Sequence, residues 1–179
     1  CMTYHRLHNI PVKIVRPFNV YGPGMKPDDH RVMPTFIYRG MNREKLPVHG
    51  GGNQTRTFCY ITDAMTGFLQ VLLGEKNGEI YNVGRQEEEI NMAQLAHTVA
   101  ELFGDVSMVE LIDYPETYPA DEPNRRCPDL AKMRDSFGYK PTVDLKTGIV
   151  RSIDWFKETY PTKSPLEDVA EEKEKTETA

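Results

Sequence analysis

Apolar side chains recur along the chain with two different periods, and segments of the two kinds alternate. Short, mostly apolar runs at 12–16 and 79–83 predict strands. Longer segments carry an apolar residue at every third or fourth position, and these predict helices over 33–42, 62–73 and 145–160. Strands that alternate with helices predict an α/β fold with a parallel sheet. The apolar character of 12–16 favours a strand covered on both faces.

Shorter signals complete the predicted order of elements. Residues 1–8 are typical of the end of a helix, and Asn91 with Gln94 three positions later resembles a capping box that begins another helix. Thr62 is a candidate N-cap for the helix that follows a strand at 57–61. Further elements are predicted as strands at 46–48 and 106–109 and as a helix at 129–137.

The length of the chain and the loss of pattern near its end define the domain organisation. A chain of 179 residues, 39% of them hydrophobic, is long enough for one globular domain with a core, which we place at 1–160. From residue 161 onward the pattern gives way to Glu, Lys and Thr, so 161–179 is predicted to be a disordered, charged tail. Because the chain starts at Cys1 within a patterned segment, we expect that it begins inside a fold.

Composition and charge exclude several classes of function. The net charge is −5, and no stripe of basic residues marks a nucleic-acid-binding surface. No apolar run approaches the length that crosses a bilayer, so no membrane partner is expected. The three cysteines are widely spaced, which argues against a disulfide framework or a metal cluster and favours a reducing, cytoplasmic setting.

Three segments carry residue types that suit ligand binding. The first is the loop 16–24, which leaves the carboxyl end of the predicted strand, where ligands bind in open α/β sheets. Pro17 lets the chain leave the sheet, and Asn19 offers both a donor and an acceptor there. A rigid structural turn explains the same residues, and the loop by itself does not decide between the two.

The second segment, 48–58, combines a glycine turn with an arginine in a predicted strand. Three consecutive glycines allow a tight turn and a close approach of the backbone to a ligand. Arg56 lies among apolar residues, where a guanidinium usually needs an anionic partner. A pyrophosphate would be one such partner, and an Asp or Glu of the chain would be another. Neither Lys-Ser nor Lys-Thr follows the glycines, so this is not a Walker loop.

The third segment, 121–129, holds Arg125 and Arg126 in a proline-bounded loop ahead of a predicted helix. Two guanidinium groups in such a loop can clamp a phosphate. A solvated charge cluster is the alternative, and it is the commoner arrangement for a charge run of this kind.

These segments, in this order and at this spacing, resemble the extended short-chain dehydrogenase/reductase family of NAD-dependent nucleotide-sugar epimerases, dehydratases and decarboxylases. The resemblance covers roughly residues 1–158. Within the family the sequence looks closest to the UDP-glucuronate decarboxylase and UDP-glucose 4-epimerase types. The matching motifs are RPFNVYGP at 16–23, GNQTRTFCYITD at 52–63, YNVG at 81–84, PNRRCPD at 123–129 and FGYKP at 137–141.

The resemblance implies a fold, a cofactor and a substrate. The chain would be the C-terminal portion of a Rossmann-type fold, with the last strands of the parallel sheet and a small mixed α/β substrate-binding domain. The implied cofactor is NAD, and the implied substrate is a UDP- or dTDP-sugar that reacts through a 4-keto intermediate. The full-length enzyme is implied to be a homodimer.

The resemblance also assigns roles along the substrate. Arg56 and Arg126 would bind the pyrophosphate, and Asn19 would contact the sugar diphosphate. Asn82 would help to line the nucleotide pocket.

Two further pairs of residues are assigned to the nucleobase and to the cofactor. Val48 and His49 would meet the base largely through their backbone, with His49 standing where the family often has an aromatic residue. Pro17 and Phe18 would pass beside the nicotinamide of NAD.

Two features of the family are missing from this sequence. It contains no Gly-rich NAD fingerprint, and none of its tyrosines has a lysine four residues later. No catalytic residue is therefore assigned in this chain, and the catalytic Tyr/Lys pair is expected upstream of Cys1.

Two other functions remain as alternatives. One is a non-catalytic nucleotide-sugar-binding or assembly module. The other is an NAD(P)-dependent reductase of a substrate that is not a nucleotide, against which Arg56 and Arg126 argue because both suit a diphosphate.

Overall fold

The structure of this protein is a computed structural model, and it describes residues 1–114 and 123–162. Helices and strands alternate along these residues, as the hydrophobic pattern predicts. The α-helices are α1 Met2–His8, α2 Val32–Met41, α3 Ile61–Leu73, α4 Met92–Leu102, α5 Ala131–Phe137 and α6 Leu145–Thr159. The strands are β1 Lys13–Pro17, β2 Val20–Tyr21, β3 Leu46–His49, β4 Thr55–Arg56, β5 Cys59–Tyr60, β6 Glu79–Val83, β7 Ile90–Asn91, β8 Val109–Ile112 and β9 Arg125–Arg126. Short 3-10 helices occupy Gly50–Gly52 and Val106–Met108.

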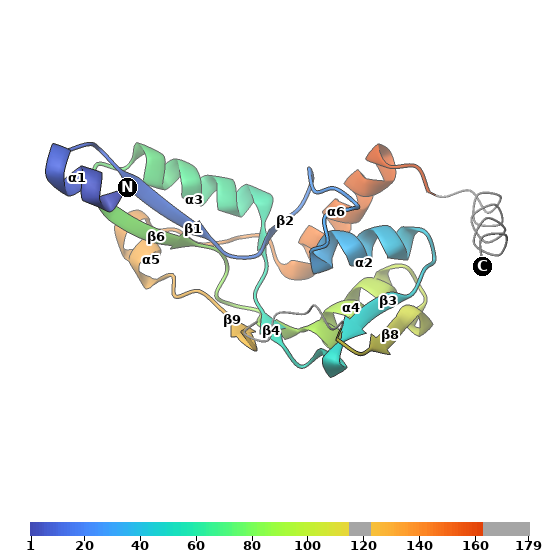
Figure 1. The fold of residues 1–179 in the computed structure, drawn as a ribbon. Coiled ribbons are helices and arrows are strands. Elements are labelled where there is room, and N and C mark those ends of the chain that lie inside the picture. Colours follow the sequence, from blue (N-terminus) through green and yellow to red (C-terminus); the bar gives the residue numbers. More distant parts are fainter. Residues whose placement is uncertain (115–122, 163–179) are drawn as a thin grey trace, which may run out of the picture.

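The elements gather at two ends of an elongated molecule. Figure 1 shows β1 and β6 with α1, α3 and α5 at one end, and β3 and β8 with α2, α4 and α6 at the other. Each end has its own cluster of buried apolar side chains, the first around Tyr81 and Met133 and the second around Phe36, Leu95 and Phe156. The apolar stripes of the helices therefore serve two separate packing centres.

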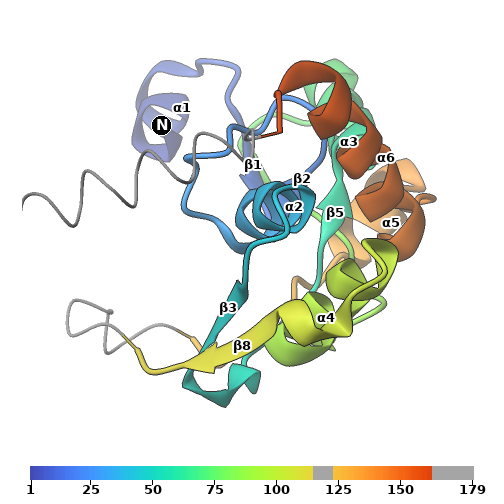
Figure 2. The ribbon, with the colours of Figure 1, turned by 90° about the vertical axis from the view of Figure 1, so that its right-hand side faces the viewer.

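Almost all strand pairs are parallel, which confirms the predicted sheet type. β1 pairs with β6, β2 with β5, and β3 with β8, all in parallel, whereas β4 lies between antiparallel β7 and parallel β9. Figure 2 shows β3 and β8 side by side beneath α2, with α4 next to them. Parallel neighbours end at the same edge, so the loops that follow them meet there.

The strand predicted at 12–16 forms at Lys13–Pro17. Among the described residues it is half-buried or exposed, so its cover on both faces stays a prediction for the complete sheet. Its only strand partner among the described residues is β6, and α3 is the helix that packs against it. Burial of a parallel strand requires neighbours on both edges and both faces, and a local apolar run cannot supply them.

Only part of the predicted strand at 57–61 forms. β5 covers Cys59–Tyr60, and α3 begins at Ile61 with Tyr60 as its N-cap, so Thr62 is not the cap. A separate short strand, β4 at Thr55–Arg56, lies ahead of the predicted range. The two short strands have different partners, since β4 pairs with β9 and β5 with β2. The chain changes sheets between them, which no alternation pattern reveals.

The predicted strand at 106–109 begins later than expected. Residues Val106–Met108 form a 3-10 helix because the Asp105 side chain accepts hydrogen bonds from the backbone N–H and hydroxyl of Ser107. β8 then starts at Val109. The capping box of α4 is confirmed, with Asn91 accepting from the Gln94 N–H at 2.7 Å and Gln94 accepting from the Asn91 N–H at 3.2 Å.

The sequence predicts neither a membrane partner nor a metal cluster. Within 1–114 and 123–162, none of the helices has the length and apolar character needed to cross a bilayer. Over the same residues the structure groups no three His, Cys, Asp or Glu side chains in a way that would hold a metal ion. The predicted tail falls almost wholly outside the described residues, at 163–179.

Candidate functional site

A cavity of about 830 Å³ opens where the segment around β2 and strands β4 and β9 face α2 and β3. Its size lies within the range of about 300–1,000 Å³ that is usual for small-molecule sites. Most of the substrate-binding residues predicted from the sequence line it, namely Asn19, Val48, His49, Arg56 and Arg126. The fold therefore collects residues of all three ligand-binding segments around one space.

Arg56 and Arg126 reach this cavity from neighbouring strands. They are register partners in the parallel pair of β4 and β9, and neighbouring strands lie about 4.8 Å apart. Arg125, one position earlier on β9, forms a bidentate ion pair with Glu89 at 2.8 Å. Successive side chains on a strand point to opposite faces. Arg125 therefore points toward Glu89, and Arg126 points toward the cavity.

Arg56 is held in place by backbone carbonyls. Only 7% of the residue is exposed, and its Nη1 donates to the carbonyl of Thr55 at 2.8 Å and to that of Asn124 at 3.3 Å. Asn124 lies directly ahead of β9, so the contact links the guanidinium of one strand to the start of the other. Two positively charged groups on adjacent strands at one cavity form an arrangement that suits an anion with several oxygens.

Asn19, just after β1, is hydrogen-bonded to the segment that follows β4. Its backbone has φ of +42°, a left-handed conformation that asparagine tolerates better than most residues. Its side-chain amide donates to the Thr57 carbonyl at 2.8 Å, and its own carbonyl accepts from the Cys59 N–H at 3.1 Å. An amide NH2 carries two donors, so this side chain can hold the wall and also contact a ligand.

Val48 and His49 form the far wall of the cavity. Val48 is buried on β3, and His49 ends that strand just before the three glycines. The His49 ring stacks on Tyr114, with ring centroids 6.0 Å apart and planes inclined by 17°. The sequence motif marked His49 but gave no signal for Tyr114.

The cavity also includes residues that the sequence reasoning missed. His30 and Arg31 line it from the loop ahead of α2, and Met92 lines it from the start of α4. Arg31 donates to Asp29 through Nε at 2.8 Å, and this contact holds the pKa of the Asp29 carboxyl below its usual range. The charged run ahead of an apolar helix was a usable signal for the loop, whereas nothing local marks Met92.

Three predicted residues do not reach this cavity. Pro17 and Phe18 lie at the carboxyl end of β1, where the Phe18 N–H donates to the Val83 carbonyl at 2.9 Å. Asn82 lies on β6, and its side chain donates to the Asp129 carbonyl at 3.1 Å. All three occupy the carboxyl edge of the β1–β6 pair, so their assignment to cofactor and nucleotide stays a prediction.

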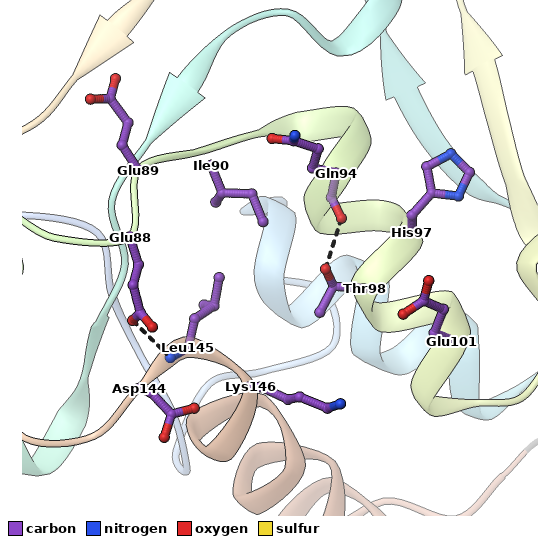
Figure 3. Close-up of a pocket in the computed structure, with 10 residues that line it drawn as sticks. All are labelled: Glu88, Glu89, Ile90, Gln94, His97, Thr98, Glu101, Asp144, Leu145 and Lys146. Carbon is purple, nitrogen blue, oxygen red and sulfur yellow. Dashed lines mark hydrogen bonds between the residues drawn. The ribbon is translucent and has the colours of Figure 1, made fainter.

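A second, shallower pocket of about 550 Å³ lies between α4 and the start of α6 (Figure 3). Two of its carboxylates already accept hydrogen bonds from backbone N–H groups of the fold. Glu88 accepts from the Leu145 N–H at 3.2 Å, and Asp144 caps α6 by accepting from the Thr147 N–H at 2.9 Å. The hydrogen bonds from Thr147 hold the pKa of Asp144 below its usual range. We therefore interpret this pocket as a gap between packed helices, and the larger cavity as the candidate ligand-binding site.

The fold and the cavity define a class of protein: an α/β protein in which parallel strands bring two arginines to a pocket of small-molecule size. Residues 1–84 match the family described as NAD dependent epimerase/dehydratase family. The chain is 39% identical to UDP-glucuronic acid decarboxylase 5 of Arabidopsis thaliana over 146 residues, which are 82% of this chain and 41% of that protein. It is 35% identical to human dTDP-D-glucose 4,6-dehydratase over 162 residues, which are 88% of this chain and 45% of that protein.

Solved structures agree with these relatives. The UDP-glucuronic acid 4-epimerase of Bacillus cereus, in complex with UDP-glucuronic acid and NAD, superimposes with a TM-score of 0.79 at 30% identity over 89% of this chain and 49% of that one. DesIV of Streptomyces venezuelae, a dTDP-glucose 4,6-dehydratase with NAD and TYD bound, gives 0.78 at 28% identity over 88% and 47%. The chain belongs to the NAD-dependent epimerase/dehydratase family, and its fold is that of the Rossmann-type enzymes of this family. It spans less than half of the length of these relatives.

Proposed function

We propose that this chain forms the nucleotide-sugar-binding part of an NAD-dependent epimerase, dehydratase or decarboxylase that acts on a UDP- or dTDP-sugar through a 4-keto intermediate. The observation that carries the proposal is the pairing of Arg56 with Arg126 in register at one cavity. A diphosphate bridges two adjacent guanidinium groups well, because each can donate two parallel hydrogen bonds to phosphate oxygens.

The diphosphate would orient the whole substrate. With the pyrophosphate on Arg56 and Arg126, the base lies toward Val48 and His49, and the sugar lies toward Asn19 at the end of β1. None of these groups takes part in bond making. Their binding energy restricts the position of the reacting sugar carbon, which lowers the entropic part of the barrier.

Residues at the carboxyl edge of the β1–β6 pair support one part of the NAD assignment, the contact with the nicotinamide. Pro17 is exposed and Phe18 is half-buried at this edge, which offers an apolar surface for a flat nicotinamide ring. The sequence has no Gly-rich fingerprint for the pyrophosphate of NAD, so the proposal leaves that contact to other parts of the enzyme. When bound, NAD would take up and return a hydride at the sugar.

The names of the relatives support the proposed class of substrate. The Arabidopsis proteins are UDP-glucuronic acid decarboxylases, and the human relative is a dTDP-D-glucose 4,6-dehydratase. We propose the same class of substrate here, bound by one domain at 1–160 with Asn82 near the nucleotide. We further propose that the complete enzyme is a homodimer and that its proton-transfer groups lie outside this chain.

The proposal is tested by turnover. The protein expressed from its full coding sequence is incubated with NAD and, separately, with UDP-glucuronate, UDP-glucose and dTDP-glucose, and the sugars are analysed by mass spectrometry and NMR. We expect conversion of at least one nucleotide sugar without net consumption of NAD, and loss of mass 44 would identify decarboxylation. Absence of turnover together with absence of UDP binding by calorimetry would overturn the proposal.

A further inference from the structure

Tyr114 lies directly behind the far wall of the cavity, although no sequence motif includes it. Its ring stacks on that of His49, and its hydroxyl accepts a hydrogen bond from Gln54 Nε2 at 2.6 Å. His49 and Gln54 both line the cavity. One aromatic residue therefore contacts two wall residues that come from opposite sides of the glycine turn.

The strand register places Tyr114 there. His49 pairs with Ile112 at the carboxyl ends of parallel β3 and β8, so the chain beyond β8 runs over the residues that follow β3. Gly50, with φ of +57°, makes room for the ring, since a Cβ at this position would lie 1.8 Å from Tyr114 Cε2. Glycine at position 50 therefore serves two purposes: it permits the positive φ of the turn, and it leaves space for the Tyr114 ring.

The orientation of His49 is set from the same side. Its Nδ1 lies 3.2 Å from the Asp113 carbonyl oxygen. A carbonyl only accepts hydrogen bonds, so Nδ1 carries the proton that is shared with Asp113. Stacking on Tyr114 sets the plane of the imidazole ring, and this hydrogen bond sets its rotation within that plane.

We infer that Tyr114 is a positioning residue that holds His49 and Gln54 as the end wall against which the nucleobase of the substrate packs. The inference rests on the proposed function, which it extends to the base end of the site. Gln54 directly precedes β4, and Gln54 and Arg56 both line the cavity. Two residues of extended chain span roughly 7 Å, which sets the scale of their separation. A ribose spans the gap between a base on Gln54 and a phosphate on Arg56.

A comparison of two ligands separates the base end from the phosphate end. UDP carries base and diphosphate, whereas inorganic pyrophosphate carries only the charged part. Calorimetry with the protein expressed from its full coding sequence measures both affinities for the wild type and for Tyr114→Leu, Tyr114→Phe and Arg126→Ala. Thermal melting followed by circular dichroism confirms that each variant is folded.

We expect Tyr114→Leu to weaken UDP about fivefold, because it removes the aromatic support of His49, and to leave pyrophosphate unchanged. Tyr114→Phe keeps the ring and loses only the contact with Gln54, so it should recover most of the UDP affinity. Arg126→Ala should weaken both ligands.

Two results would overturn the inference, and they are distinguishable. If the wild type binds UDP but Tyr114→Leu changes neither ligand or both ligands alike, Tyr114 does not act at the base end, and the proposed function stands. If the wild type binds neither UDP nor pyrophosphate, the proposed function fails and the inference fails with it.

Discussion

Arg56 and Arg126 are cross-strand neighbours on β4 and β9, although a long stretch of chain separates them. Arg125, the residue next to Arg126, instead pairs with Glu89 on the other side of the strand. The alternation of side chains along β9 therefore decides which of its two arginines lines the cavity.

This relationship predicts different effects for the two arginines of β9. Arg126→Ala should weaken UDP binding by about tenfold or more, since a charged hydrogen bond contributes roughly 1.5–3 kcal/mol. Arg125→Ala should leave UDP affinity close to that of the wild type. Isothermal titration of both variants in the same low-salt buffer measures the difference.

Arg125→Ala is a matched control because it removes the same side chain from the adjacent position. Its ion pair with Glu89 is exposed, and exposed pairs contribute little to stability. Equal losses of UDP affinity in the two variants would show that binding responds to net charge and would contradict the assignment of Arg126.

The glycine turn offers a second matched pair. Gly50→Ala and Gly51→Ala both place a side chain at positive φ, at an expected cost of about 1–2 kcal/mol. Only the Cβ at Gly50 would overlap the Tyr114 ring, since at Gly51 the nearest atom is Asn53 Nδ2 at 3.5 Å. We expect similar melting temperatures for the two variants and a loss of UDP affinity in Gly50→Ala alone. Loss of affinity in both would indicate that the turn itself, and not the ring, is needed.

Asp63 connects α3 to the segment ahead of α6. It is 6% exposed and accepts hydrogen bonds from the backbone N–H groups of Thr142 and Val143 at 3.0 and 2.9 Å. Asp63→Asn can keep an oxygen toward the two N–H groups and turn its NH2 toward the Thr142 hydroxyl, but it removes the charge that strengthens these hydrogen bonds. Unfolding should therefore become easier by about 1–2 kcal/mol. Urea denaturation measures the change, and Asp135→Asn at an exposed position of α5 is the control. An unchanged urea midpoint for Asp63→Asn would refute this structural role.

The Cys59 thiol is predicted to be unreactive in the folded protein. Burial disfavours the thiolate and raises the pKa of Cys59 to about 11. At pH 8 a disulfide reagent should label exposed Cys1 quickly and Cys59 only after unfolding. The release of reagent anion, followed with and without denaturant and in Cys59→Ala, measures this. Rapid labelling of Cys59 in the native protein would contradict it.

The same raised pKa predicts how stability changes at alkaline pH. The folded protein keeps the Cys59 proton up to about pH 11, whereas the unfolded chain releases it near pH 9.0. The unfolded state therefore binds fewer protons between these values, and the free energy of unfolding should fall as pH rises from about 9 to about 11. Burial also raises the pKa of Tyr21, which acts in the same direction at higher pH. Urea midpoints between pH 8 and 11 measure the fall, and Cys59→Ala should reduce it.

Local sequence patterns were sufficient to predict the helices that have a clear hydrophobic periodicity or a capping motif. The apolar stripe of α2, the capping box of α4 and the long helix α6 all appear within a few residues of their predicted positions. They were predictable because helix hydrogen bonds and caps join residues only three or four positions apart. The break between β4 and β5 was not predictable, since these strands pair with two different partner strands.

The sequence by itself determined an α/β chain, the three ligand-binding segments and the arginines within them. The tertiary structure alone decided that Arg126 is the register partner of Arg56 while Arg125 pairs with Glu89, and that Tyr114 stacks on His49. The reason is physical: strand pairing forms between segments that are distant in sequence, and a shift of one residue in register sends a side chain to the opposite face. Periodicity along one segment carries no information about the register with its partner.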